Sequence, residues 1–164
     1  MARKVFHTFH FKRDSQRVSQ VRNMGVIEGQ PVLSGNDWEK VKRAGDAAIE
    51  RWINENMSGR SCVVVLIGGA TAGRKWVNYE IRKAWNEKRG LVGVHIHKLK
   101  DLSGAQSAKG ANPFESVRIG GTPLSSICKT YDSPYSSSAD TYAYIKANLE
   151  SCVEEGISIR NSYK

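Results

Sequence analysis

The chain has no apolar run that could cross a membrane. Of its 164 residues, 40% are hydrophobic, but no run approaches the roughly 20 residues that a membrane helix needs. The first residues lead straight into a short strand pattern, without the apolar stretch and small-residue cleavage site of a signal peptide. These features predict a cytoplasmic protein that binds no membrane. The length predicts one domain over residues 1–164.

Metal-binding patterns are also missing. The three cysteines match no zinc spacing and are predicted to be reduced thiols, two of them in the core: Cys62, Cys128 and Cys152. The four histidines fall on two predicted strands and form no His-Glu-x-x-His pair: His7, His10, His95 and His97. The sequence therefore predicts no metal site.

Three motifs of nucleotide-binding and hydrolytic enzymes do not occur. The glycine-rich stretch 68–73 lacks the Gly-Lys-Ser/Thr ending of a P-loop and the spacing of a dinucleotide fingerprint. No Gly-x-Ser-x-Gly elbow is present, which argues against a Ser–His–Asp hydrolase.

The chain has fewer acidic residues (16) than Lys and Arg residues (25), and its formal net charge is +9. Lys and Arg are scattered along the chain and often alternate with acids, as in 39–43 and 82–89. This pattern favours a solvated basic surface, which would also attract an anionic nucleotide. A nucleic-acid-binding domain stays open as a weaker hypothesis, because the aromatic and basic sheet motifs of such folds are absent.

Apolar and β-branched runs predict the strands of a sheet at residues 4–11, 62–67 and 91–96, with a short edge strand within 125–131. The run 62–67 is apolar throughout, which is typical of a central parallel strand covered on both faces.

Apolar residues at helical spacing predict four helices, at 12–23, 36–58, 74–88 and 138–156. Asn36 and Ser138 are the expected N-caps, and Gly90 and Gly156 the expected helix stops. Trp38 and Trp52 are expected to pack rather than to contact a ligand. The alternation of strands and helices predicts an α/β class with a doubly wound, mostly parallel sheet.

The richest candidate site follows the central strand. The turn 68–73 and the first turns of the next helix lie at the carboxyl end of that strand, where open α/β sheets bind ligands. Trp76 and Glu80 are four residues apart and share a helix face. Glu80 borders the core stripe, so its carboxylate can point into a cleft. Backbone N–H groups near Gly68 and Gly69 are candidates for binding phosphate.

The end of the first predicted strand supplies further candidates. His10 is a candidate hydrogen-bonding residue or base. Phe9, Phe11 and Trp76 are candidates for stacking on a base or a ring.

Residues 5–14 resemble the first conserved box of TIR domains, in which an aromatic strand leads to an acidic position. Residues 74–81 resemble the tryptophan element of the same domains, with Glu80 four residues after Trp76. Together with 37–39, 90–97 and 109–114, these stretches resemble the TIR-like family of prokaryotic proteins, which includes the TIR-like subunit of the Thoeris anti-phage system. Two departures stand out: Val77 replaces the usual Cys, and the loop after the first helix lacks a family signature.

The resemblance implies a flavodoxin-like TIR fold and chemistry on NAD+, with Glu80 as the catalytic residue beside the ribose that carries nicotinamide. NAD+ is then the substrate, with no separate cofactor, and the product is a cyclic ADP-ribose isomer that signals to an effector protein. The expected substrate contacts are Phe9, His10, Phe11, Gly68, Gly69 and Trp76. A homo-oligomer and a phage-derived activator are further partners that such a system implies.

The alternative is a non-catalytic TIR-like module that acts by self-association or by binding a nucleotide.

Overall fold

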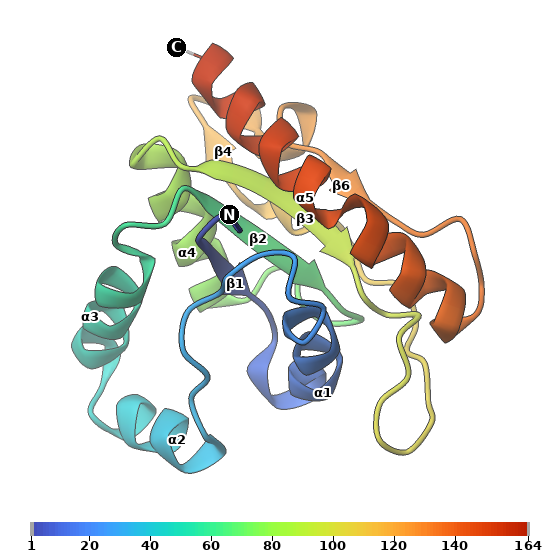
Figure 1. The fold of residues 1–164 in the computed structure, drawn as a ribbon. Helices are drawn as coiled ribbons and strands as arrows, with labels where there is room; N and C mark the ends of the chain where they lie inside the picture. The colour runs from blue at the N-terminus through green and yellow to red at the C-terminus, as the bar shows by residue number, and fades with distance from the viewer. Residues whose placement is uncertain (1, 164) are drawn as a thin grey trace.

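The computed structural model describes residues 2–163, and its centre is a four-stranded sheet in which every neighbouring pair is parallel (Figure 1). The strands lie in the order β1, β2, β3, β6, with bounds Val5–Thr8, Cys62–Ile67, Gly90–His95 and Thr130–Tyr131. Helices cover both faces of this sheet. The predicted α/β class with a parallel, doubly wound sheet is confirmed.

One face of the sheet is covered by α1 (Phe11–Arg22) and α5 (Ser138–Ser162). Their apolar side chains, such as Val18 and Leu149, pack on Val64 and Val92 from the central strands. The other face is covered by α3 (Asp46–Met57) and α4 (Lys75–Asn86). Because successive side chains of a strand point to opposite faces, the all-apolar run of β2 supplies both halves of the core.

The outer edge of β1 is closed by the segment that follows α1. The Val5 amide donates to the Glu28 carbonyl at 2.8 Å. The side-chain amide of Gln30 then takes the place of a strand, since its Oε1 accepts from His7 N at 2.8 Å and its Nε2 donates to His7 O at 2.9 Å. This pairing holds the segment 24–34 beside the sheet.

The remaining elements are short. Helix α2 (Gly35–Arg43) precedes α3, and the β3–β6 connection carries two 3₁₀ turns, η1 (Pro113–Ser116) and η2 (Leu124–Ser126), around the hairpin β4 (Arg118–Ile119) and β5 (Thr122–Pro123). The short strand predicted within 125–131 is β6, at the edge of the sheet.

The first strand is shorter than predicted. It ends at Thr8, and α1 begins at Phe11. The cause is His10, whose backbone is extended and whose side chain accepts from Arg13 N, so that it serves as the N-cap of α1.

The prediction of one helix over 36–58 was wrong, because the chain breaks at Gly45, where φ is 97°. This left-handed conformation is easily adopted only by glycine. Ser34, not Asn36, caps the first of the two helices, and its side chain accepts from Asp37 N.

Both predicted glycine stops were also wrong. Helix α5 continues past Gly156 to Ser162, and Gly156 instead allows close packing, since a Cβ there would lie 3.0 Å from Leu91 O. The turn after α4 is made by Lys88, with φ 60°, and Gly90 is the first residue of β3. Ser137 rather than Ser138 is the N-cap of α5.

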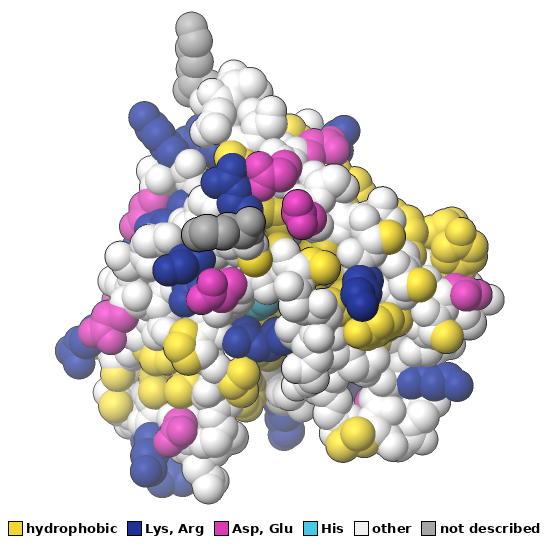
Figure 2. Space-filling model, in the orientation of Figure 1, with side chains coloured by type: hydrophobic (Ala, Val, Ile, Leu, Met, Phe, Trp, Pro, Cys, Tyr) yellow, Lys and Arg dark blue, Asp and Glu magenta, His cyan; other side chains and the backbone are white. Residues whose placement is uncertain are grey.

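Across residues 2–163, no helix is both long and apolar enough to traverse a bilayer. The three cysteines are free and buried, one more in the interior than predicted. Figure 2 shows Lys and Arg side chains dispersed over the visible face, interspersed with Asp and Glu.

Candidate active site

A cavity of about 880 Å³ lies beside β1, between α1, α2, α3 and the first turns of α4. It sits at the carboxyl end of β1, which is the edge of a parallel sheet where ligands bind. Its volume is within the range of small-molecule and cofactor sites.

Five aromatic rings form a continuous wall of this cavity, which we call the aromatic wall: Phe6, Phe9, Phe11, Trp38 and Trp52. The ring centroids of Phe11 and Trp38 are 5.7 Å apart, and those of Trp38 and Trp52 are 5.9 Å apart. Phe9 stacks on Phe11 at 6.0 Å, and Phe6 meets Trp52 at 6.0 Å. These spacings lie in the range of favourable ring pairs.

Glu80 lines the same cavity from α4 and is only 8% exposed. Val77, Ile81 and Ala84 anchor α4 on the sheet, and Glu80 lies next to Ile81 on the side that faces the cavity. Trp76, one turn earlier, lines the cavity too, with the Lys75 ammonium 5.0 Å from its ring centroid.

Burial raises the pKa of the Glu80 carboxyl well above its usual value, and the nearby Thr8 hydroxyl offsets part of that rise. The two groups do not form a hydrogen bond of regular geometry, since Thr8 Oγ1 has no partner among the described residues. No cation of residues 2–163 forms an ion pair with Glu80. Burial therefore favours the neutral form of this carboxyl, and a cation placed beside it would favour its ionised form.

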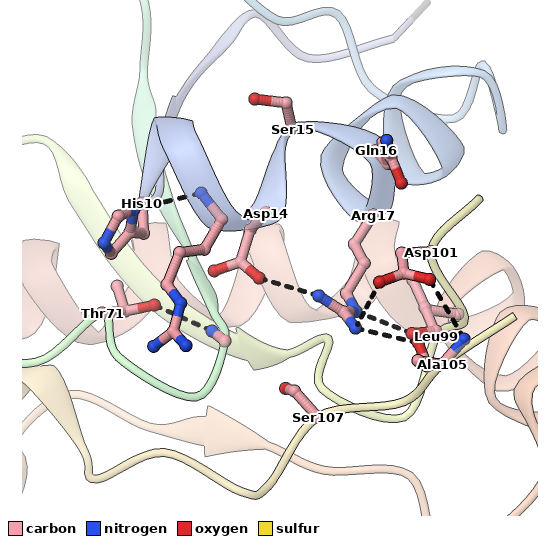
Figure 3. A network of polar contacts seen from close by, with 12 residues as sticks. His10, Asp14, Ser15, Gln16, Arg17, Thr71, Leu99, Asp101, Ala105 and Ser107 are labelled. Atoms are coloured by element: carbon pink, nitrogen blue, oxygen red, sulfur yellow. Dashed lines mark hydrogen bonds and ion pairs between the residues drawn. The ribbon is translucent and has the colours of Figure 1, made fainter. Parts of the chain in front are cut away.

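His10 lies at the start of α1 and also lines the cavity. Its Nδ1 accepts the capping hydrogen bond from Arg13 N at 3.3 Å (Figure 3). Burial lowers the pKa of His10, and the positive charge of Arg74 lowers it further.

Basic side chains make up most of the charged part of the lining: Lys12, Arg22, Lys42, Arg74 and Lys75. Among residues 2–163, Glu80 is the single acidic residue that lines this cavity. Two of the cations are paired, Lys42 with Glu39 at 3.0 Å and Lys75 with Asp46 at 2.5 Å. The cavity therefore has an excess of positive charge.

Gly68 and Gly69 do not line this cavity, although Ala70, Ala72 and Gly73 from the same turn do. A Cβ on Gly68 would lie 2.1 Å from the Asp14 carboxylate, and one on Gly69 would lie 3.0 Å from Ala108 O. The Gly68 amide donates to Thr71 Oγ1 at 2.8 Å. Gly68 is thus covered by α1, and Gly69 by the segment near Ala108.

A buried ion pair holds α1 in place (Figure 3). Arg17 donates to Asp14 Oδ1 at 3.2 Å, to Leu99 O at 2.7 Å and to Ala105 O at 3.0 Å. These bonds tie α1 to the loop after β3, and so fix the first turn of α1, with His10 as its cap, at the cavity.

Five of the predicted site residues meet at one cavity: Phe9, His10, Phe11, Trp76 and Glu80. Their roles toward a substrate stay predictions. Sequence reasoning missed Lys12, Arg74, Trp38 and Trp52 as residues of this cavity. The two tryptophans pack on the core as expected, and also face the cavity because the break at Gly45 folds α2 back onto α3.

In the described part of the chain, no group of three or more His, Cys, Asp or Glu residues is arranged to hold a metal ion.

Comparison with known proteins defines the class to which this fold and site belong. Residues 6–101, more than half of the chain, match the family model "Thoeris protein ThsB, TIR-like domain". The chain belongs to this family of TIR-like domains, which confirms the resemblance drawn from the sequence. The matched segment contains all of β1 except Val5, together with β2, β3, Trp76 and Glu80.

A particular relative is the protein named "Putative cyclic ADP-D-ribose synthase ThsB1" from Bacillus cereus (strain MSX-D12). The two sequences are 38% identical over an alignment of 120 residues, which covers 70% of this chain and 62% of that protein. The chain thus spans less than two thirds of the relative's length.

Proposed function

We propose that this protein cleaves NAD+ at the bond between nicotinamide and ribose and forms a cyclic ADP-ribose-type signal in antiviral defence. One observation carries the proposal: Glu80, 8% exposed and unpaired with any cation of residues 2–163, lines a cavity bounded by aromatic rings and basic side chains. The family membership and the name of the Bacillus cereus relative support it.

The bond to nicotinamide breaks with its electron pair, which passes to the cationic ring nitrogen and leaves neutral nicotinamide. The anomeric carbon becomes an oxocarbenium-like cation, and the Glu80 carboxylate stabilises that charge in a site largely removed from water. A nucleophile elsewhere in the same ADP-ribose unit, an adenine nitrogen or a ribose hydroxyl, then attacks this carbon and gives up a proton, which forms a cyclic product; attack by water instead gives linear ADP-ribose. In this scheme NAD+ is the substrate and no separate cofactor takes part.

Binding of NAD+ would itself prepare Glu80 for this role. Burial raises the pKa of the Glu80 carboxyl and so favours its neutral form while no cation lies beside it. The cationic nicotinamide ring would favour ionisation when it lies beside Glu80. The carboxylate would then form at the place and time at which positive charge has to be stabilised.

We extend the proposal to the setting of the reaction. NAD+ is a cytoplasmic metabolite, so we place the protein in the cytoplasm, with the product read by a separate effector protein. Assembly of several copies and a phage-derived component are the proposed triggers.

The test is incubation of the purified protein with NAD+, with nicotinamide and nucleotide products identified by mass spectrometry. We expect the wild type to release nicotinamide and a cyclic product, and Glu80→Gln to lose this activity by roughly a hundredfold or more. Glu50→Gln, which changes an exposed carboxylate of α3, is the matched control. Thermal melting of each variant separates loss of activity from loss of folding.

If the wild type releases no nicotinamide, either concentrated or with an extract of phage-infected cells, the enzymatic proposal is wrong. Binding of nucleotide without turnover would then identify the chain as the non-catalytic module.

A further inference from the structure

His10 has two ring nitrogens with different surroundings, and the structure fixes which one carries the proton. The Arg13 backbone N–H can only donate, so the Nδ1 that it meets at 3.3 Å accepts. A neutral imidazole has one N–H, and that hydrogen is then on Nε2.

The Nε2–H group has no partner in the described residues, although His10 is only 7% exposed and lines the cavity. Nε2 is not among the fully buried polar atoms of the described residues, so it is accessible from the cavity that His10 lines. An acceptor bound in the cavity can therefore reach this N–H group.

The charge around His10 indicates which kind of acceptor fits. Burial lowers the pKa of His10 most. Arg74, which precedes the first turn of α4, and Arg13 on α1 lower it further, and Asp14 raises it, so two cations and one acid lie near its ring. Lys12, in the first turn of α1, lines the same cavity. The nearby acid, Asp14, is engaged by Arg17.

The backbone adds to this positive field. His10 caps the N-terminus of α1, a helix of 12 residues, and Arg74 occupies the corresponding position before α4. Helix N-termini carry partial positive charge and favour anions. An anion is therefore favoured by the free donor, by the cations and by both helix ends.

We propose that His10 donates a hydrogen bond from Nε2 to a phosphate oxygen of the dinucleotide, at a subsite completed by Lys12 and Arg74. This inference rests on the proposed function, and it moves the phosphate contact from the covered turn at Gly68 and Gly69 to the first turn of α1. His10 then acts as a donor rather than as a base.

The subsite is tested by the binding of ADP, which has a diphosphate but no nicotinamide, with adenosine as the reference without phosphate. The informative variant is His10→Asn, because Asn is a good N-cap and keeps an acceptor for Arg13 N but loses the ring N–H. Calorimetry should show ADP affinity falling roughly 10- to 100-fold, as expected for a hydrogen bond to a charged group. Adenosine affinity should be unchanged.

Controls separate this role from folding. His10→Ala loses the cap as well and should melt earlier than His10→Asn. Lys12→Ala and Arg74→Ala should weaken ADP binding, whereas Lys40→Ala, an exposed position on α2 outside the cavity lining, should not.

An independent readout is the tautomer of His10, which ¹⁵N NMR of the ring nitrogens reports directly. We expect the Nε2–H form. The Nδ1–H form, the absence of ADP binding, or equal ADP affinity in the wild type and His10→Asn would overturn the proposal. If ADP binds through His10 but NAD+ is never cleaved, the phosphate subsite stands and the proposed enzymatic function fails.

Discussion

At the scale of single residues, Glu80 decides the character of the cavity. A carboxyl that is 8% exposed and has no cationic partner in residues 2–163 is destabilising when ionised. A glutamine at this position would have the same shape and would stabilise the fold at least as well. Its presence is better explained by a role toward a cationic group inside the cavity.

The same residue leads to a prediction about stability. The pKa of Glu80 is raised in the folded protein above its ordinary value of 4.5. Below pH 4.5 the carboxyl is protonated in both the folded and the unfolded protein. Between that value and the higher pKa of the folded protein, only the unfolded chain loses the proton. As the pH rises through this range, the wild type therefore loses stability relative to Glu80→Gln, by at most about 1.4 kcal/mol per pH unit.

Urea unfolding of both proteins from pH 4 to 8 measures this difference. The Glu50→Gln variant should show almost no such dependence, because Glu50 is exposed. A constant difference between the wild type and Glu80→Gln at all pH values would contradict the prediction.

At the scale of secondary-structure elements, α2 is the part of the cavity least tied to the core. None of its residues is fully buried, and Gly45 with φ 97° joins it to α3. Its main contribution is Trp38, which bridges Phe11 and Trp52 across the cavity. Helix α2 therefore covers the cavity more than it supports the sheet.

Trp38→Ala should reduce the affinity for ADP-ribose roughly tenfold, because an aromatic ring that stacks on a base is worth about 1–3 kcal/mol. The melting temperature should change little, since α2 buries no residue fully. Trp38→Phe keeps a ring and should retain most of the affinity. Calorimetry and thermal melting of the two variants test this, and a large loss of stability with unchanged affinity would show that Trp38 only packs.

At the scale of the whole molecule, α5 holds one side of the sheet. Gly156 and Gly90 let helix and strand approach closely, since a Cβ on Gly90 would lie 2.8 Å from the Ile157 Cα. Beyond Gly156, the Arg160 guanidinium donates to Trp85 O at 3.1 and 3.0 Å and lies 4.1 Å from the centroid of the Trp85 ring. The last turns of α5 thus secure the end of α4, the helix that carries Glu80.

Removal of residues 157–164 should therefore destabilise the protein. The lost hydrogen bonds and cation–π contact alone correspond to roughly 2–4 kcal/mol. Arg160→Met in the full chain should reproduce part of this loss, and Asn161→Ala, at an exposed position, almost none. Urea unfolding measures each effect. An unchanged free energy of unfolding after truncation would show that the last turns of α5 do not stabilise the protein.

Particular elements show how far prediction from sequence can reach. The strand at 62–67 was predicted with its observed bounds, Cys62–Ile67, because an unbroken apolar run between turn residues has few alternatives. The helix at 36–58 was not, because Val41, Ala44, Ala48 and Ile49 continue their spacing across Gly45. Local spacing cannot reveal that the chain turns there.

In the candidate site, what the sequence determines differs clearly from what the tertiary structure determines. The sequence by itself determined the class of fold, the helix of Glu80 and the shared face of Trp76 and Glu80, because these depend on local periodicity and on neighbours along the chain. Only the tertiary structure decided that Trp38, Trp52, Lys12 and Arg74 face the same cavity, that His10 has its free N–H on Nε2, and that Gly68 and Gly69 are covered. The reason is physical: a cavity is formed by side chains from elements far apart in sequence, and their positions depend on packing that no single segment contains.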